Sequence, residues 1–320
     1  MFIIRFVLEI SYNKPKLDPQ AQWNPEGITF ATSTIIGRSP LGIFISRNNT
    51  IYVADRTLGR IVVWLNDLLN ETKIIADDIV LPKALFVAAN GDIFTGNTYP
   101  SSRVDRRQLN SNSTTVVMLV DAECYGLFVD RTYNLYCSLR DLNRVVKKPI
   151  NSVSNMLTVV AGPNCSFPDS NSLDRPYGIF VDINFDLYVA DFGNHRIQLF
   201  SPDRLNATTV AGSSAVGTIA LYYPTGVTLD ADNYLFIVDN GNSRIVGSGP
   251  NGFRCVAACS GKGSTSNSLK DPLTMAFDSY GNIYVTDQNN NRTQKFVLLN
   301  NTYRKSVRFI EVIFLMHICL

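Results

Sequence analysis

The chain of 320 residues has only two histidines, His195 in a polar turn and His317 near the C-terminal end. A histidine base needs a partner placed beside it, and a histidine-based zinc site needs several such ligands. Two histidines so far apart in the sequence speak against a Ser/His/Asp or Cys/His constellation. We therefore predict no catalytic residue, no cofactor and no metal ligand.

Charge is also scarce, because Asp, Glu, Lys and Arg make up only 18% of the residues. Lys and Arg number 29 and Asp and Glu number 27, which gives a net charge of +2. Without a basic excess, nucleic-acid binding is not expected. Hydrophobic residues at 45% and aromatic residues at 11% exclude a disordered chain or a coiled coil.

No long apolar run is present. Met1–Ile10 is interrupted by Arg5 and Glu9, and no clear signal-peptide cleavage site follows it. Phe309–Leu320 has only twelve residues and contains Glu311, which is too short for a membrane span. We expect no membrane span.

The six cysteines include no Cys-x-x-Cys pair, which disfavours a zinc site. Cys255 and Cys259 lie on a predicted strand, where their separation would be about 13 Å, so their pairing would need a bend near Ala258. Cys124 and Cys137 lie on adjacent predicted strands, but not opposite each other. The sequence leaves the disulfide connectivity open.

One pattern recurs six times along the chain. Each copy opens with Pro (once Cys), continues through an apolar run and a polar turn, and reaches a usually polar anchor fifteen residues later. The copies are Pro40–Asp55, Pro82–Asn97, Cys124–Leu139, Pro176–Asp191, Pro224–Asp239 and Pro272–Asp287. An arginine follows the anchor by five residues, or by six in the second copy: Arg60, Arg103, Arg144, Arg196, Arg244 and Arg292.

Each copy has room for four short strands. In the fourth copy, strands are predicted over 178–182, 187–190, 196–200 and 208–211, separated by turns rich in Gly, Asn and Asp. Six such units predict a β-propeller. The small residue two positions after most of the openings fits an innermost strand, where the blades crowd the axis.

The segments Tyr188–Ile197, Phe236–Ile245 and Tyr284–Asp287 resemble the core of an NHL repeat. The resemblance covers about residues 23 to 300, and it implies a six-bladed propeller. It does not imply one function, because the family includes lyases, RNA binders, ubiquitin-ligase substrate modules and extracellular sensors. The lyase members use a zinc site with several histidines, which this chain lacks. Asn97, Leu139 and Cys124 depart from the pattern.

We predict an all-β fold, a six-bladed β-propeller of four-stranded antiparallel blades that is closed by an N-terminal strand. Residues 27–31 resemble the fourth strand of a blade and are predicted to complete the last one, with Val307–Leu315 as the competing segment. The predicted domain limits are an irregular N-terminal segment 1–22, the propeller 23–302 and an irregular apolar tail 303–320.

The repeated polar residues are predicted to be structural. The anchors Asp55, Asn97, Asp191, Asp239 and Asp287, with the six arginines, are expected to hold turns by hydrogen bonds and ion pairs. Gly247–Gly252 matches a dinucleotide fingerprint, but the strand predicted after it makes it a hairpin turn. Asp287–Asn291 resembles the start of a calcium loop, yet Arg292 and Leu298 stand where that loop needs Gly and Glu.

Three functions compete. The first is a non-catalytic interaction module that binds an unidentified protein, peptide or glycan on a propeller face. The second is a metal-dependent lactonase or hydrolase. The third is an RNA-binding or ubiquitin-ligase-associated module. For the metal-dependent enzyme, the candidate carboxylates stand at equivalent positions of the repeats: Asp130, Asp182, Asp230 and Asp278. Each is equally the first residue of a hairpin turn.

The chain contains seven Asn-x-Ser/Thr sequons, which are candidate glycosylation sites. They are Asn48, Asn70, Asn112, Asn164, Asn206, Asn291 and Asn300. Together with the low charge, they favour an extracellular or secreted location.

Overall fold

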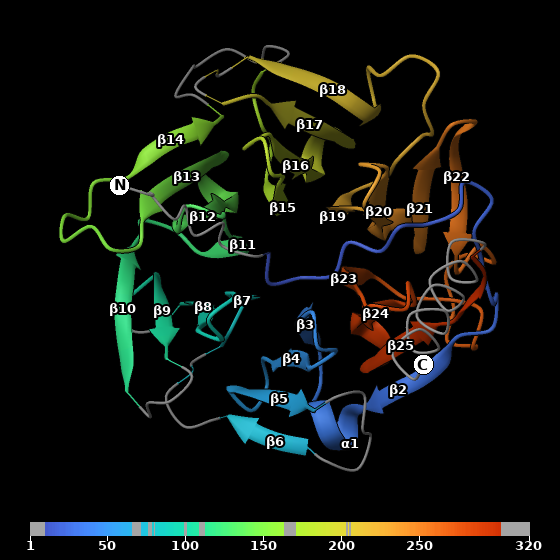
Figure 1. Cartoon of the computed structure of the whole chain (residues 1–320), viewed down its shortest axis with the longest axis horizontal. Coiled ribbons are helices and arrows are strands. Elements are labelled where there is room, and N and C mark those ends of the chain that lie inside the picture. Colours follow the sequence, from blue (N-terminus) through green and yellow to red (C-terminus); the bar gives the residue numbers. More distant parts are fainter. Residues whose placement is uncertain are drawn as a thin grey trace, which may run out of the picture.

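Six four-stranded antiparallel sheets stand around a central axis, as the computed structural model shows (Figure 1). The structure describes residues 10–65, 72–75, 79, 81–98, 101–108, 113–162, 171–202, 204 and 206–301. The prediction of a six-bladed β-propeller is confirmed. Each blade is a meander whose first strand lies at the axis and whose fourth lies at the rim.

The first three blades follow the chain without interruption. Blade 1 consists of β3 (Pro40–Ile45), β4 (Ile51–Asp55), β5 (Arg60–Trp64) and β6 (Thr72–Ile75). Blade 2 consists of β7 (Ala84–Val87), β8 (Ile93–Asn97), β9 (Arg103–Arg107) and β10 (Thr114–Leu119). Blade 3 consists of β11 (Cys124–Val129), β12 (Asn134–Leu139), β13 (Arg144–Pro149) and β14 (Thr158–Ala161).

The next two blades repeat this order, and the last one borrows a strand. Blade 4 consists of β15 (Pro176–Val181), β16 (Leu187–Asp191), β17 (Arg196–Phe200) and β18 (Ala207–Gly212). Blade 5 consists of β19 (Pro224–Leu229), β20 (Leu235–Asp239), β21 (Arg244–Gly249) and β22 (Gly252–Ala257). Blade 6 takes β23 (Pro272–Phe277), β24 (Ile283–Asp287) and β25 (Arg292–Phe296) from the end of the chain.

The strand β2 (Ile28–Thr32) completes blade 6 and closes the ring. It pairs antiparallel with β25, from Ile28 opposite Lys295 to Thr32 opposite Arg292. The predicted closure by an N-terminal strand is thus confirmed. The competing segment Val307–Leu315 lies outside the described residues. A short helix α1 (Ser33–Ile36) then leads into blade 1.

The propeller has two unlike faces. We call the face with the turns between the first two strands of each blade the hairpin face. The opposite face, which holds the turns after the repeat anchors and the connections between blades, is the anchor face. Because all inner strands run in the same direction, the equivalent turns of every blade lie on the same face.

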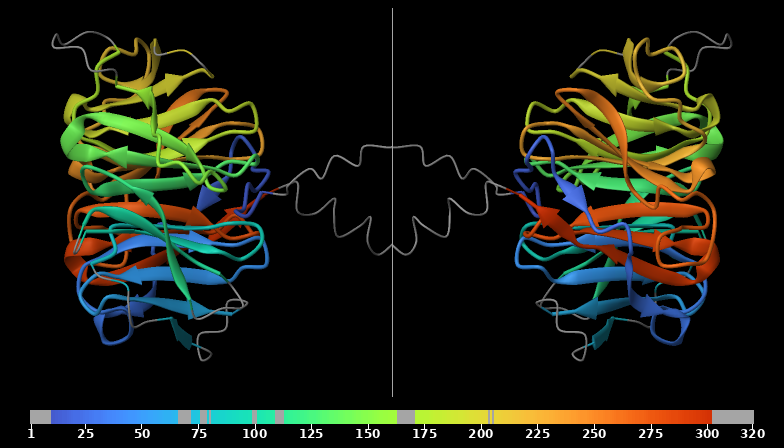
Figure 2. Two further views of the ribbon diagram at one scale, coloured as in Figure 1. Left: turned by 90° about the vertical axis from the view of Figure 1, so that its left-hand side faces the viewer. Right: turned by 90° about the vertical axis from the view of Figure 1, so that its right-hand side faces the viewer.

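Residues 10–23, here called the strap, cross the hairpin face from the axis outward (Figures 1 and 2). The Asn13 side-chain amide donates hydrogen bonds to the carbonyls of Ser46 and Phe277, which joins blades 1 and 6. The Trp23 indole donates to the carbonyl of Gly281. The strap ends in β1 (Gln22–Trp23), which pairs with β26 (Leu298–Asn300). Its backbone is mostly irregular, yet it packs firmly onto the propeller.

The interior is built from apolar strands packed blade against blade. Four phenylalanines at the same position of successive inner strands form a chain of ring contacts of 4.9–5.1 Å: Phe44, Phe86, Phe128 and Phe180. The ring of Tyr12, from the strap, packs edge-on against the last two. The strap therefore closes the axial channel at the hairpin face.

Close approach at the axis explains the glycines of the inner strands. A Cβ atom on Gly126 would lie 2.5 Å from the carbonyl oxygen of Tyr177, and one on Gly178 would lie 2.5 Å from that of Thr225. Since real Cβ contacts are never that short, only glycine lets neighbouring blades pack at this distance.

Two disulfides cross-link the described part of the chain, Cys124–Cys137 and Cys255–Cys259. The first joins the two inner strands of blade 3 where their register is irregular. The second is possible because Ala258, at a φ of 55°, bends the chain after β22. The bend that the spacing required near Ala258 is present.

Candidate functional site

Four anchor carboxylates lie fully buried on the anchor face, with 0% exposed: Asp55, Asp191, Asp239 and Asp287. Each accepts a hydrogen bond from the Nε of the arginine five residues later, at 2.7–2.9 Å, and these are Arg60, Arg196, Arg244 and Arg292. In blades 4, 5 and 6 the other oxygen accepts a backbone N–H of the preceding connection, from Asp174, Tyr222 and Lys270.

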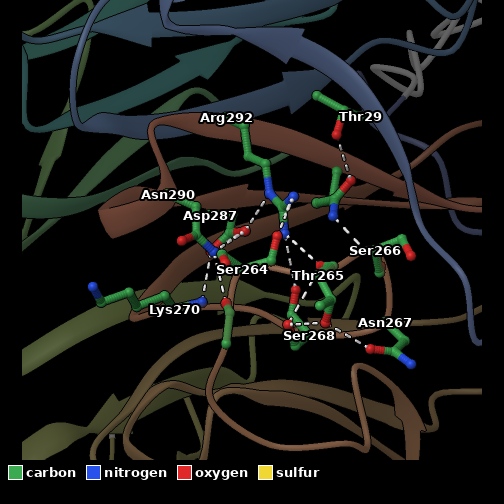
Figure 3. A network of polar contacts seen from close by, with 12 residues as sticks. Thr29, Ser264, Thr265, Ser266, Asn267, Ser268, Lys270, Asp287, Asn290 and Arg292 are labelled. Atoms are coloured by element: carbon green, nitrogen blue, oxygen red, sulfur yellow. Dashed lines mark hydrogen bonds and ion pairs between the residues drawn. The ribbon is translucent and has the colours of Figure 1, made fainter.

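The network in blade 6 shows what these pairs do (Figure 3). Arg292 donates to the carbonyls of Ser264, Thr265 and Ser268, while Asp287 accepts from the backbone of Lys270. One ion pair thus holds the connection between blades 5 and 6 against the anchor turn. Both oxygens of the Asp287 carboxylate accept hydrogen bonds, from Lys270, Asn290 and Arg292, which suits a structural role.

Blades 2 and 3 depart from this arrangement, which corrects the grouping of Asn97 with the anchor aspartates. In blade 2 the carboxylate comes from Asp105 on β9, which accepts from Asn97 at 2.6 Å and from Arg103 at 2.9 Å. In blade 3 Leu139 carries no polar group, and Arg144 lies 3.8 Å from Asp121 of the preceding connection. Neither Arg103 nor Arg144 pairs with its anchor.

The four aspartates considered for a metal site lie on the hairpin face and are occupied by their own turns. In each, one oxygen accepts the backbone N–H groups of the residues two and four positions later: Asp130, Asp182, Asp230 and Asp278. Among the described residues, no three His, Cys, Asp or Glu side chains gather to hold a metal ion. Gly247–Gly252 spans the hairpin between β21 and β22, so it opens no helix.

Asp230 makes the stability of the folded chain depend on pH. Burial raises the pKa of Asp230 from 3.8 to about 6, although hydrogen bonds in its turn and Lys14 of the strap lower it. The folded state therefore holds this proton more tightly than the unfolded chain. Its contribution to stability is complete below about pH 4 and is lost as the pH rises to about 6.

We expect Asp230→Asn to remove this loss, because the amide keeps an acceptor for the turn and carries no charge. The free energy of unfolding of the variant, relative to that of the wild type, should be about 1–2 kcal/mol higher at pH 7 than at pH 4. This value is reduced for solvent screening. Urea denaturation at pH 4, 5, 6 and 7 measures the difference. Parallel curves over this range would contradict the assignment.

The inner strands enclose an axial cavity of about 130 Å³. Tyr12 and Asn13 of the strap line its hairpin end, whereas Lys83 and Tyr125 line its anchor end. This space has room for a few ordered water molecules. Its anchor end, beside Lys83 and Tyr125, is the mouth of the channel.

A polar cluster stands at that mouth. The hydroxyl of Tyr125 accepts hydrogen bonds from Lys83 at 3.2 Å and from Arg140 at 3.3 Å. Lys83 also forms an ion pair with Glu123 at 2.9 Å. Burial alone would raise the pKa of Glu123, but Lys83, Tyr125 and Arg56 outweigh it, and the pKa of this carboxyl is lowered.

An aromatic row extends from this cluster across blades 3, 4 and 5. We use the name for Tyr125, Tyr177, Phe192, Tyr223 and Tyr222, whose successive ring centroids lie 5.0, 6.1, 4.7 and 4.4 Å apart. Tyr222 is 46% exposed, and the other four rings are half-buried. Half-buried aromatic rings with a cation beside them are typical of binding hot spots.

His195 positions the end of this row. Its Nδ1 accepts the backbone N–H of Tyr223 at 3.0 Å, and its ring lies 4.9 Å from that of Tyr222 and 4.4 Å from that of Tyr223. Since Nδ1 is an acceptor, the neutral ring carries its proton on Nε2. His195 thus holds two tyrosines in place. Among the described residues, its contacts do not pair it with a nucleophile as a catalytic base would be paired.

The aromatic row is the part of the site that sequence reasoning missed. Tyr125 and Tyr177 directly follow the openings of two repeats, Phe192 follows an anchor, and Tyr222 and Tyr223 precede the opening Pro224. A signal was available in the sequence. Each of these residues is close to the opening residue or the anchor of a repeat, and these positions lie on the same face. The prediction of binding on a propeller face covered these turns without naming the residues.

No family model matches the sequence. No curated protein matches it significantly either. Solved structures do resemble the propeller. One is a protein of unknown function from Bacteroides thetaiotaomicron VPI-5482, with a TM-score of 0.64 at 14% identity over 91% of this chain and 76% of that chain.

Two others have named roles. A streptogramin B lyase has a TM-score of 0.61 at 14% identity, over 85% of this chain and 97% of that chain. An auxiliary nutrient binding protein from Bacteroides ovatus ATCC 8483 has a TM-score of 0.57 at 14% identity, over 92% of this chain and 77% of that chain. At these identities the likeness shows the six-bladed propeller fold. In the described residues no helix is long and apolar enough to cross a membrane.

Proposed function

We propose that this chain is a non-catalytic, NHL-type propeller that binds a protein or peptide partner through its anchor face. The observation that carries the proposal is the aromatic row with its cations at the channel mouth. This surface lies on the face opposite the strap, which covers the channel at the hairpin face. The six repeats, four of which carry an Asp–Arg anchor pair, support the NHL assignment, and the similar nutrient binding protein supports a binding role.

We further propose that the protein works outside the cell as a secreted glycoprotein. Two disulfides are typical of proteins that fold in an oxidising compartment. Three exposed sequons, Asn48, Asn206 and Asn300, all lie on the hairpin face. Asn291 differs, because it is half-buried in an anchor-face turn where its side-chain oxygen accepts the N–H of Ser39. Asn70, Asn112 and Asn164 lie outside the described residues.

This distribution predicts where glycans are attached. In chain secreted from eukaryotic cells, we expect glycans on Asn48, Asn206 and Asn300, and none on Asn291, so that the anchor face near blade 6 stays free. Enzymatic deglycosylation in heavy-oxygen water, followed by peptide mass spectrometry, measures the occupancy of each site. Full occupancy of Asn291, or three empty hairpin-face sites, would contradict the proposal.

The binding function is tested by selecting linear peptides from a display library on the folded chain. We expect the selected peptides to bind Tyr222→Ala at least tenfold more weakly than the wild type. Tyr280→Ala serves as the control, because that tyrosine is 49% exposed on the hairpin face. Equal loss in both variants, or no loss in Tyr222→Ala, would refute anchor-face binding.

A further inference from the structure

Two guanidinium groups converge on one ring in the middle of the aromatic row. Arg140, in the turn after β12, lies 6.0 Å from the ring centroid of Phe192, and Arg175, in the connection before β15, lies 5.4 Å from it. A cation over an aromatic face is held by the ring quadrupole while its outer edge keeps contact with solvent. The side chains of Arg140 and Arg175 are 28% and 42% exposed.

The carboxylates beside these arginines hold them only loosely. Asp141 lies 3.8 Å from Arg140, and Asp174 lies 3.2 Å from Arg175, both at exposed positions. Exposed pairs of this kind contribute little to stability. A carboxylate from a partner can therefore replace them at little cost, and a bidentate contact with a guanidinium is stronger than either pair.

The charges at the channel mouth leave the arginines available to such a partner. Glu123 provides the carboxylate of the mouth cluster. Its ion pair with Lys83 balances the positive charge of that lysine. Arg140 meets the same cluster through the uncharged side chain of Tyr125, donating to its hydroxyl and lying 5.0 Å from its ring centroid. Positive charge at the centre of the row is thus provided by Arg140 and Arg175.

We propose that the anchor face recognises a linear acidic peptide segment. Asp or Glu carboxylates of the segment bind Arg140 and Arg175 over Phe192. Neighbouring apolar or aromatic side chains of the segment pack on Tyr177, Tyr223 and Tyr222. This inference rests on the proposed function, and it adds the chemical class of the partner.

A peptide suits this surface better than a sulfated polysaccharide. Neighbouring rings of the row are inclined to one another by 30–64°, so they offer pockets between rings more than one flat platform. A polyanion is held by many basic side chains along its length, whereas here two arginines act together in a chain of net charge +2. Arginine and tyrosine are both enriched in the hot spots of protein-recognition surfaces.

The test uses the same display selection on the full chain, with the peptide sequences and two variants as readouts. We expect the selected peptides to be enriched in Asp and Glu next to apolar residues. Fluorescence anisotropy should show at least tenfold weaker binding to the double variant Arg140→Gln/Arg175→Gln, and binding that weakens with added NaCl. The matched control is Arg131→Gln, because Arg131 lies 4.9 Å over Phe185 on the opposite face and should bind like the wild type.

Each other outcome is decisive. Peptides that depend on Tyr222 but show no acidic enrichment and bind the double variant equally would overturn this inference and leave the proposed function standing. A heparin hexasaccharide that binds more tightly than the peptides and displaces them would also overturn it. If no selected peptide depends on the anchor face, both proposals fail. Thermal melting of each variant shows whether it is folded.

Discussion

Removal of residues 1–35 is expected to abolish the cooperative unfolding of the propeller. The deletion takes away β2, which provides the rim strand of blade 6, and exposes the edge of β25. It also removes Leu17, Trp23 and Ala31, all buried against the rest of the fold. Burying one large apolar side chain contributes about 1.5–3 kcal/mol. The total loss therefore approaches the about 5–15 kcal/mol that stabilises a typical domain.

Point variants of β2 provide the control for this deletion. Ala31→Arg should be strongly destabilising, because Ala31 is buried in the contact between blades 6 and 1. Ile28→Lys on the same strand should cost little, since Ile28 is 56% exposed. Circular dichroism during thermal melting measures all three chains. An unchanged melting temperature after the deletion would mean that another segment closes the ring.

Replacement of Asp191 by alanine is expected to cost about 3–5 kcal/mol of stability. The change leaves Arg196, whose side chain is only 9% exposed, without its carboxylate. It also removes the acceptor for the backbone of Asp174, which anchors the connection between blades 3 and 4. Leaving a buried charge without its partner is the costly part of such a substitution.

Guanidinium denaturation of Asp191→Ala, Asp191→Asn and Asp141→Ala separates charge from hydrogen bonding. Asp191→Asn keeps an acceptor and should fall between the wild type and the alanine variant. Asp141→Ala removes an exposed carboxylate near Arg140 and should stay within about 0.5 kcal/mol of the wild type. A loss below about 1 kcal/mol in Asp191→Ala would show that the anchor pair does not hold the blades.

The blades were predictable because the residues that define the repeat have fixed spacings. The opening residue and the anchor are fifteen residues apart in all six copies, and in five copies an arginine follows the anchor by five residues, so each copy aligns the strands of the next. The closing strand was predictable for the same reason, since residues 27–31 resemble the fourth strand of a blade. Both signals are local in sequence, and the structure reproduces them.

Other features depend on contacts that no local pattern encodes. Asp105 takes over the role of the second anchor because its place on β9 brings it to both Asn97 and Arg103. The strap has no periodic pattern, and its position follows from where Tyr12 and Trp23 find partners on distant blades. The aromatic row joins residues at unlike offsets of different repeats, which meet only because the fold places all of those offsets on one face.

Hydrogen–deuterium exchange of the full chain, with and without the tightest selected peptide, tests the central claim most directly. The claim predicts slower exchange on peptide binding only in anchor-face segments around the aromatic row, namely residues 139–143, 174–178, 192–196 and 221–224. The strap and the hairpin-face turns should exchange at unchanged rates. Protection in the strap or the hairpin-face turns, with none around Phe192, would contradict it.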